Sequence, residues 1–449
     1  MSKKLFVFVF ISFNFFSQLN SQSKFIEEIV DSTFNFPDST LIVRNIYFMG
    51  NKITKAYTIE KEMSLKRDSL LTFNKLEFDN NRIYSLQLFN IVKIKVKQDS
   101  IFADLTVEVV EQFYFFVFPV FGFKDRDASH FFYGAGVMYR NINGEAENFS
   151  IRTAYGYDPF ITLSYESPYF KRENDVFLDA SLISNMYLNK SMATLEEDEK
   201  NYYERWNSIN ITIGKRVDVF NNYSFTGGFT NVFVKNNKPR RTVSKNGTDN
   251  FPWIKFTKKY DTRDLKEFAT TGSHYRFEIA KFGTNKDEVD YFKLTYDGKY
   301  FFPIKEKSTI GFRTFASLVN GSRLAHYQKE YFGYEMRLRG HYQIIHEGEN
   351  LIYSGLEYRT PIYGPKYFHL KNLPFEQIRD FKAAIYGTLF FDFGSVWDRN
   401  QNWKDKKMSG YGFGLNFLAS YKMVIRTEVA FKTETRPIPN FIIGAGASF

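Results

Sequence analysis

The alternation of apolar and polar positions divides the chain at about residue 112. Before it, a strand-like segment ends at the turn pair Gly50-Asn51, and Thr54 is placed to cap a short helix. The expected elements, in order, are a strand over 41–48, helices over 55–63 and 74–88, and strands over 91–96 and 101–110. This β-α-α-β-β order predicts one small N-terminal α+β domain over residues 41–111.

From residue 113 to 449 the pattern has a period of two, with no convincing amphipathic helix. Ile425, Val429 and Phe431 share one face of a late segment, whereas Arg426 and Glu428 share the other. Such alternation is typical of strands with one face toward lipid and one toward water. Sixteen strands are expected near residues 113, 131, 146, 159, 175, 203, 222, 251, 273, 289, 307, 350, 381, 409, 422 and 440. The fold class predicted is therefore an all-β transmembrane barrel of about 16 antiparallel strands.

The connections between these strands are uneven in length. If consecutive strands run in opposite directions, the four long connections fall on the same side of the membrane, outside the cell. They are residues 188–202, 234–250, 320–349 and 397–408. The stretch 361–380 is expected to form a long turn on the opposite side.

Composition supports a membrane barrel and argues against other classes. Aromatic residues make up 19% of the chain, charged residues 24%, and the mean hydropathy is -0.37. The net charge of +10 is spread along the alternating segments, so nucleic acid is not an expected partner, and outer-membrane lipids are. Cysteine is absent, the six histidines are scattered, and no nucleophile elbow or phosphate loop occurs, so no enzyme, metal or cofactor is expected.

The first residues have the pattern of an export signal. Lys3 and Lys4 precede an apolar run over 5–16, and small polar residues follow. This run is too short to span a bilayer, so residues 1–22 are predicted to be a cleaved signal peptide. Export followed by insertion places the protein in the outer membrane of a Gram-negative bacterium, with the small domain in the periplasm.

Several motifs resemble the BamA and TamA family of outer-membrane proteins. The Gly50-Asn51-x-x-Thr54 turn and the closing strand over 107–109 are similar to a POTRA domain, the family's periplasmic module. Three barrel motifs follow in the family's order. They are Asp261-x-Arg263-Asp264 with Gly272 downstream, Leu338-Arg339-Gly340-His341, and Phe391-Asp392-Phe393-Gly394. The last strand ends on Phe449, which resembles the C-terminal assembly signal of such barrels.

The resemblance implies that the loop carrying Arg339 folds back into the barrel. Because Leu389 and Phe391 alternate toward lipid, Asp392 and Gly394 are expected to face the lumen. A buried arginine needs a carboxylate partner, and a glycine leaves room for the approaching loop. Asp392 is therefore expected to pair with Arg339, with Glu357 as a second candidate. His341 stands where the family has an aromatic residue, and Tyr342 follows it.

The function implied is assembly of outer-membrane proteins. The POTRA domain would capture unfolded or nascent polypeptides by strand addition, and the barrel would open between its first and last strands, weakened by Gly444 and Gly446. Accessory lipoproteins are further expected partners. A single POTRA domain leaves open two alternatives: a dedicated secretion pore for one exported polypeptide, and a passive porin or surface antigen.

Overall fold

The computed structural model describes residues 41–124, 129–193, 202–235, 237–265, 268–284, 288–304, 308–334, 336–342, 344–369, 380–419, 424–433 and 438–447. The predicted signal peptide and Phe449 lie outside the described residues. No helix in these ranges is both long and apolar enough to cross a membrane.

The N-terminal part is a small domain in which helices pack on one four-stranded sheet. Its elements are β1 (Leu41–Met49), α2 (Ala56–Glu60), β2 (Leu70–Leu71), α3 (Phe73–Tyr84), β3 (Phe89–Asp99) and β4 (Phe102–Glu111). The sheet order is β2-β1-β4-β3, with β1 and β4 parallel. The expected order of elements omitted β2, which has only two residues and pairs with the start of β1.

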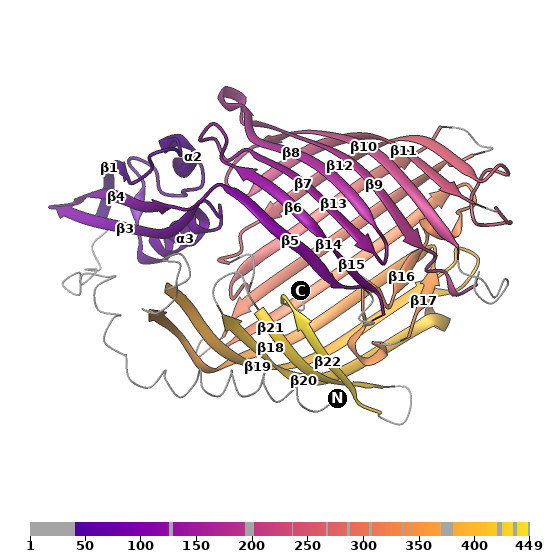
Figure 1. Cartoon of the computed structure of the whole chain (residues 1–449). Helices are drawn as coiled ribbons and strands as arrows, with labels where there is room; N and C mark the ends of the chain where they lie inside the picture. Colours follow the sequence, from indigo (N-terminus) through magenta and orange to yellow (C-terminus); the bar gives the residue numbers. More distant parts are fainter. Residues whose placement is uncertain are drawn as a thin grey trace.

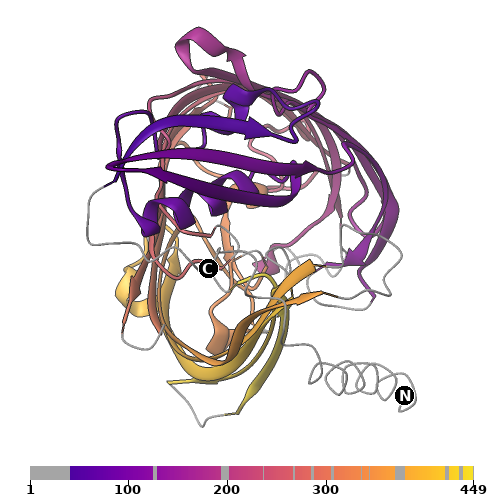
Figure 2. The same ribbon diagram turned by 90° about the vertical axis from the view of Figure 1, so that its left-hand side faces the viewer.

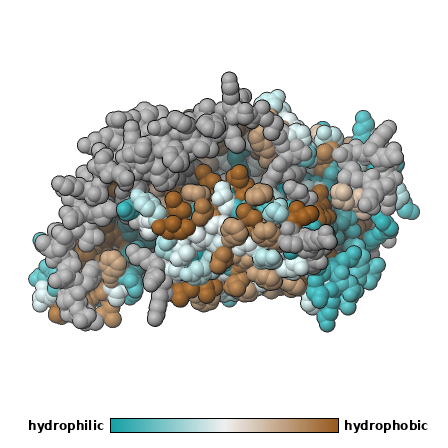
Figure 3. Space-filling view, turned by 90° about the horizontal axis from the view of Figure 1, so that it is seen from below, coloured by the Kyte–Doolittle hydropathy of each residue, from teal (hydrophilic) through white to brown (hydrophobic). Residues whose placement is uncertain are grey.

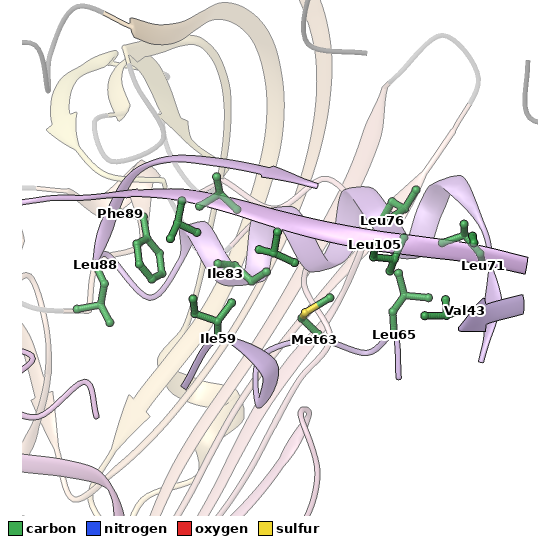
Figure 4. Close-up of a cluster of buried hydrophobic side chains, with 14 of the residues drawn as sticks. Val43, Ile59, Met63, Leu65, Leu71, Leu76, Ile83, Leu88, Phe89 and Leu105 are labelled. Atoms are coloured by element: carbon green, nitrogen blue, oxygen red, sulfur yellow. The ribbon is translucent and has the colours of Figure 1, made fainter. Parts of the chain in front are cut away.

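One apolar core holds this small domain together. Leu76 and Ile83 lie on the buried face of α3, while Val43 and Leu105 point from the two central strands. Figure 4 shows these side chains meeting Ile59 and its neighbours between the helices and the sheet. Because the sheet alternates and the helix repeats every three to four residues, each element supplies one apolar face to the core.

The remaining strands form one sheet of sixteen, as predicted. In chain order they are β5 (Phe115–Phe123), β6 (Phe131–Arg140), β7 (Asn148–Gly156), β8 (Phe160–Lys171), β9 (Val176–Leu188), β10 (Tyr203–Arg216), β11 (Asn221–Val234), β12 (Thr248–Asp261), β13 (Gly272–Phe282), β14 (Tyr291–Pro303), β15 (Thr309–Gly321), β18 (Asn350–His369), β19 (Asp380–Trp397), β20 (Lys407–Ala419), β21 (Val424–Lys432) and β22 (Asn440–Ala445). Neighbours in sequence are antiparallel neighbours in space, and the sheet curls into a barrel (Figure 1).

The barrel has two distinct rims. The rim next to the small domain, here called the domain-side rim, carries the connections after β6, β8, β10 and β12. The four long connections all lie at the opposite, far rim, and the connection over 322–349 contains the short strands β16 (Glu330–Phe332) and β17 (His346–Gly348). The expected long turn over 361–380 is wrong. β18 instead continues to His369, which pairs with Asp380, and two register shifts accommodate the stretch from Pro361 to Lys366.

Apolar side chains cover the outside of the barrel wall. Leu389 is 60% exposed and Phe413 is 53% exposed, although neither lies near a loop. In Figure 3, apolar groups gather over the middle of the wall, and hydrophilic groups gather at the far rim. A band of exposed apolar residues between polar ends is typical of a transmembrane barrel.

The first and last strands of the sheet, β5 and β22, lie at its two edges. Within the described residues neither pairs with the other, so the sheet is not closed by a ladder at this point. β22 has six residues and is bonded on one side only, to β21. The two edges face each other across the front of the barrel in Figure 1.

Candidate functional site

The connection over 322–349 enters the lumen and packs against the inside of the barrel. Its Phe332 and Leu338 join a buried cluster with Leu351, Tyr353 and Val396, which point inward from β18 and β19. On its other side Tyr342 packs against the inner wall formed by β19, β21 and β22. Tyr342, which follows His341 in the sequence, therefore provides an aromatic contact with the wall at this motif. The His341 ring lies 6.0 Å from that of His346, within the same loop.

Arg339 lies at the tip of this loop and is buried against three carboxylates. Its Nε and Nη2 each donate to Asp392 at 2.7 Å, in a bidentate pair. Its Nη1 donates to Glu357 at 2.8 Å and to Glu428 at 3.1 Å. The guanidinium also stacks over the Phe390 ring at 3.6 Å. The structure thus places both predicted partners in contact with Arg339 and adds Glu428.

Two glycines allow the loop to approach the wall. A Cβ on Gly340 would lie 2.6 Å from the carbonyl oxygen of Phe431 and 2.7 Å from the Cα of Gly410. A Cβ on Gly394 would lie 2.7 Å from the ring of Phe332, a residue of the loop. The Gly340 carbonyl accepts a hydrogen bond from Asn440 at 2.8 Å, so the loop tip also contacts the last strand.

Sequence reasoning missed two further arginines of this cluster. Arg359 is fully buried and donates from Nε to Glu357 at 2.7 Å, while Arg426 lies 3.5 Å from Glu428. Together with Arg339 they balance the three carboxylates, as burial of so many charges requires. The sequence carries one signal for these arginines, because strand alternation places both on the lumen face. Which of the lumen charges contact one another, however, depends on where the loop enters the lumen. No group of His, Asp and Glu in the described ranges is arranged to hold a metal ion.

The Asp261-x-Arg263-Asp264 motif forms the turn between β12 and β13 at the domain-side rim. Arg263 pairs with Asp261 at 2.8 Å, and Asp264 accepts the Thr270 amide at 2.9 Å. Gly272 then begins β13.

This turn reaches across to the opposite wall of the barrel. The ring centre of Phe268 lies 4.9 Å from that of Tyr386 on β19. Both residues belong to a buried cluster with Leu418 of β20 and Val424 of β21. The Ala269 carbonyl accepts from Arg359 at 3.2 Å. The charged cluster and the domain-side turn are therefore in direct contact.

The predicted helix cap at Thr54 is wrong. α2 begins after Lys55, which makes no side-chain cap. Thr54 is buried instead, where its hydroxyl donates to Glu111 at 2.6 Å and accepts from Asn141 at 2.9 Å. Burial raises the pKa of Glu111, but the hydrogen bonds from Thr54 and Ile53 outweigh this effect and hold that pKa below its usual value. Thr54 thus joins the small domain to the barrel.

The rest of the POTRA-like turn has a structural role. Gly50 has a φ of +87°, and a Cβ there would lie 2.0 Å from the Val109 carbonyl oxygen. The Asn51 amide donates to the Thr54 carbonyl at 2.9 Å. The turn therefore positions Thr54 at the junction with the barrel.

A second set of contacts fixes the small domain over the domain-side mouth of the barrel (Figure 2). Glu62 binds Arg82 of the small domain at 3.0 Å and Arg216 of β10 at 2.6 Å. Arg82 also donates to the Val219 carbonyl at 3.0 Å. These buried charges restrain the domain against the turn between β10 and β11. Tyr57 contacts the turn after β8 through Arg172, and Thr54 contacts the turn after β6 through Asn141.

The glycines near the end of the chain lie on or just after β22. A Cβ on Gly444 would lie 2.7 Å from Nε of Arg426, so this glycine makes room for a member of the charged cluster. The Gly446 amide donates to the Val424 carbonyl at 2.7 Å, just past the end of the strand.

Comparison with known proteins identifies the class. The family model described as "Omp85 superfamily domain" matches residues 141–449, and the model "Surface antigen variable number repeat", a POTRA family, matches residues 41–112. The chain belongs to the Omp85 superfamily, with one POTRA domain. No curated protein sequence matches it significantly.

Solved structures share the fold at low sequence identity. BamA from Haemophilus ducreyi lacking POTRA domains 1–3 matches with a TM-score of 0.57 and 16% identity, over 90% of this chain and 84% of that one. CdiB from Escherichia coli matches with a TM-score of 0.57 and 11% identity, over 90% and 75%. CdiB from Acinetobacter baumannii gives 0.52 and 11%, over 91% and 73%. Membership of the superfamily places the chain in the outer membrane and supports a role in inserting polypeptides into that membrane or moving them across it.

Proposed function

We propose that this protein inserts client polypeptides into the outer membrane through the seam between β5 and β22, with a POTRA domain over residues 41–111 in the periplasm and a barrel over 113–449. Among the residues that the structure describes, the facing edges of these two strands are unpaired, and these edges carry the proposal. Backbone groups in a bilayer must be hydrogen-bonded, so a client strand can enter only with its backbone paired. Two free edges that face each other provide such pairing.

Capture is assigned to β3 of the POTRA domain. β3 lies at one edge of the four-stranded sheet and is eleven residues long, whereas the strand at the other edge has two. An extended client segment can add to a long free edge by main-chain bonds alone. Lys93, Lys95 and Lys97 alternate along β3, and charges of this kind discourage pairing with a second copy of the same edge.

The lumen loop favours insertion at the seam over passage through the pore. Residues 338–342 pack on both sides against the inner wall, and Arg339 is buried among carboxylates. A polypeptide crossing the lumen would have to displace these contacts. One entering at the seam would have to displace the contacts of the loop with β22, which include those of Asn440 and Ile442.

A dedicated secretion pore is the second candidate, and the opposite wall of the lumen supports it. Between β7 and β11 this wall carries small hydroxyl side chains that bond across strands, including Ser150 with Ser164 and Thr212 with Thr226. Such a surface offers hydrogen bonds without bulk, which suits the passage of an extended chain. A passive porin is the third candidate; it predicts a channel conductance that removing the loop leaves unchanged.

A crosslinking experiment tests insertion. A photoreactive amino acid replaces Ile443, which is 75% exposed on β22, and the matched control position is Phe413, exposed on β20 two strands away. Insertion predicts client crosslinks at Ile443 and few at Phe413. Equal crosslinking at the two positions, or none at either during active assembly, would refute client insertion at the seam.

Depletion separates assembly from secretion. Quantitative proteomics of outer-membrane and secreted fractions is expected to show a broad loss of barrel proteins after the protein is depleted. Loss of one exported protein, with the barrels unchanged, would instead identify a dedicated translocator.

A further inference from the structure

A row of polar side chains crosses the outside of the barrel wall on four adjacent strands. Ser184 of β9 donates to the Asn207 amide oxygen at 2.8 Å, and Asn207 of β10 donates to Asn231 at 3.2 Å. Asn231 of β11 in turn donates to Asn250 of β12 at 2.7 Å. These four residues, here called the amide row, are register partners along the sheet.

Strand alternation places the amide row on the lipid-facing side. Two residues away on the same strands, Leu182, Ile209 and Phe229 form the next row, each between 46% and 48% exposed. They are register partners in the same order, so the two rows lie side by side on one face. Polar groups toward hydrocarbon are costly unless other polar groups satisfy them. Within the row each amide oxygen accepts one hydrogen bond, and a polar neighbour would satisfy the N–H groups that the row leaves over.

A hollow in the wall adjoins the amide row. Its cavity volume is about 650 Å³, and its lining combines apolar groups with three members of the row. Ile151, Ile161 and Leu163 extend the lining onto β7 and β8, and Ser184, Asn207 and Asn231 form its polar border. The hollow is thus almost wholly apolar, and the hydrogen-bonding groups of the amide row lie along one border of it.

Positive charge lies beyond the amide row, toward the far rim. Arg205 is exposed two residues before Asn207, and Lys235 is exposed four residues after Asn231, so alternation puts both on the outer face. Phe233 pairs with Arg205 and is 43% exposed. Aromatic and cationic side chains at this level are typical of the boundary between hydrocarbon and headgroups.

We propose that the amide row and the hollow form a binding site for a phosphorylated glycolipid of the leaflet at the far rim. An acyl chain fits the apolar floor. Amides both donate and accept, so they match sugar hydroxyl groups, and the two cations match phosphate. Asn250 adds to this argument, because within the described part of the chain its amide accepts from Asn231 and donates no hydrogen bond. Its two N–H groups are available to a headgroup.

Native mass spectrometry of the purified full-length chain in detergent tests the site. Diphosphoryl lipid A is the probe, and phosphatidylglycerol is the competing lipid. Wild-type protein is expected to retain lipid A. The double variant Asn207→Leu/Asn231→Leu is expected to bind it at least tenfold more weakly, because the headgroup loses its amide partners. The control is Asn210→Leu, on the same strand as Asn207, whose side chain bonds to Ser181 on the lumen face.

A second variant, Leu182→Trp, fills the hollow and leaves the amide row intact. It is expected to weaken lipid A binding as well. The folding of the double variant is judged by its heat-modifiable electrophoretic mobility. If the double variant does not fold, the binding of lipid A by Leu182→Trp tests the site instead. Unchanged binding by the folded variants would overturn the site. Equal retention of phosphatidylglycerol would overturn the assignment of a glycolipid as the ligand. Since the measurement needs no client, either outcome leaves the proposed insertion function untouched.

Discussion

Replacing Arg339 by alanine is expected to release the lumen loop from the barrel wall. The change leaves Asp392, Glu357 and Glu428 buried without Arg339, while Arg359 stays bonded to Glu357 and Arg426 stays close to Glu428. Removing one partner of a buried ion pair costs about 3–5 kcal/mol. Since one factor of ten corresponds to about 1.4 kcal/mol, the undocked loop should become roughly 100- to 4,000-fold more populated.

Limited proteolysis with chymotrypsin measures this population. The enzyme cleaves after aromatic residues, which the loop supplies at Tyr331 and Tyr342, and cleavage follows the undocked fraction when docking is fast. The control is Arg337→Ala, which removes the same side chain two residues away, where its Nε donates to the Tyr334 carbonyl. Cleavage of Arg339→Ala at the wild-type rate would refute the reasoning that this cluster holds the loop.

Three further changes test other parts of the molecule. Gly340→Val should also release the loop, since its side chain would collide with Gly410, and chymotrypsin cleavage should accelerate as for Arg339→Ala. Gly50→Ala should destabilise the small domain by about 1–3 kcal/mol, because alanine is strained at positive φ and its Cβ meets the Val109 carbonyl; faster hydrogen exchange over 41–111 would show it. Glu111 has a pKa that is lowered in the folded protein. Its stabilisation of the junction is therefore fully present above its unfolded pKa of about 4.3, and it is lost as the pH falls through the lower folded pKa. Hydrogen exchange at the Ile53 and Thr54 amides should rise in that pH window.

Each of these tests has its own control. Gly227→Ala adds a methyl group where nothing lies within 4 Å, so it should leave both loop and small domain unchanged. Glu111→Gln removes the titrating group, and the junction should then lose its acid sensitivity. If Gly50→Ala exchanged as slowly as the wild type, or if Glu111→Gln kept the full acid response, the corresponding contact would not be the one that stabilises the domain.

The strand count was predictable because a barrel wall imposes the same period of two on every strand. The errors arose where local signals compete with tertiary contacts. Pro361 and Gly364 lie in the stretch that was expected to be a turn, yet register shifts let β18 continue through them. Thr54 has the form of a helix cap, but Glu111 and Asn141, both far away in sequence, take its hydroxyl. The two residues of β2 are too few to show alternation.

The charged cluster was only partly predictable for a related reason. Alternation assigns Asp392 and Glu357 to the lumen, and the motif around Arg339 supplies the cation that meets them. Which other lumen charges take part depends on how deeply the loop enters and on the turn that reaches from the opposite rim. No local pattern encodes either, so Arg359 and Glu428 could not be singled out.

Glu357 joins the two ends of the barrel through its two oxygens. One binds Arg339 of the far-rim loop at 2.8 Å, and the other binds Arg359 at 2.7 Å, which reaches the domain-side turn at Ala269. A change that withdraws the loop alters the charge balance felt by Arg359, and a change in the turn alters the site offered to Arg339. By thermodynamic linkage this influence is reciprocal. A ligand that binds the loop at the far rim and a ligand that displaces the turn at the domain-side rim would therefore each change the other's affinity by the same factor.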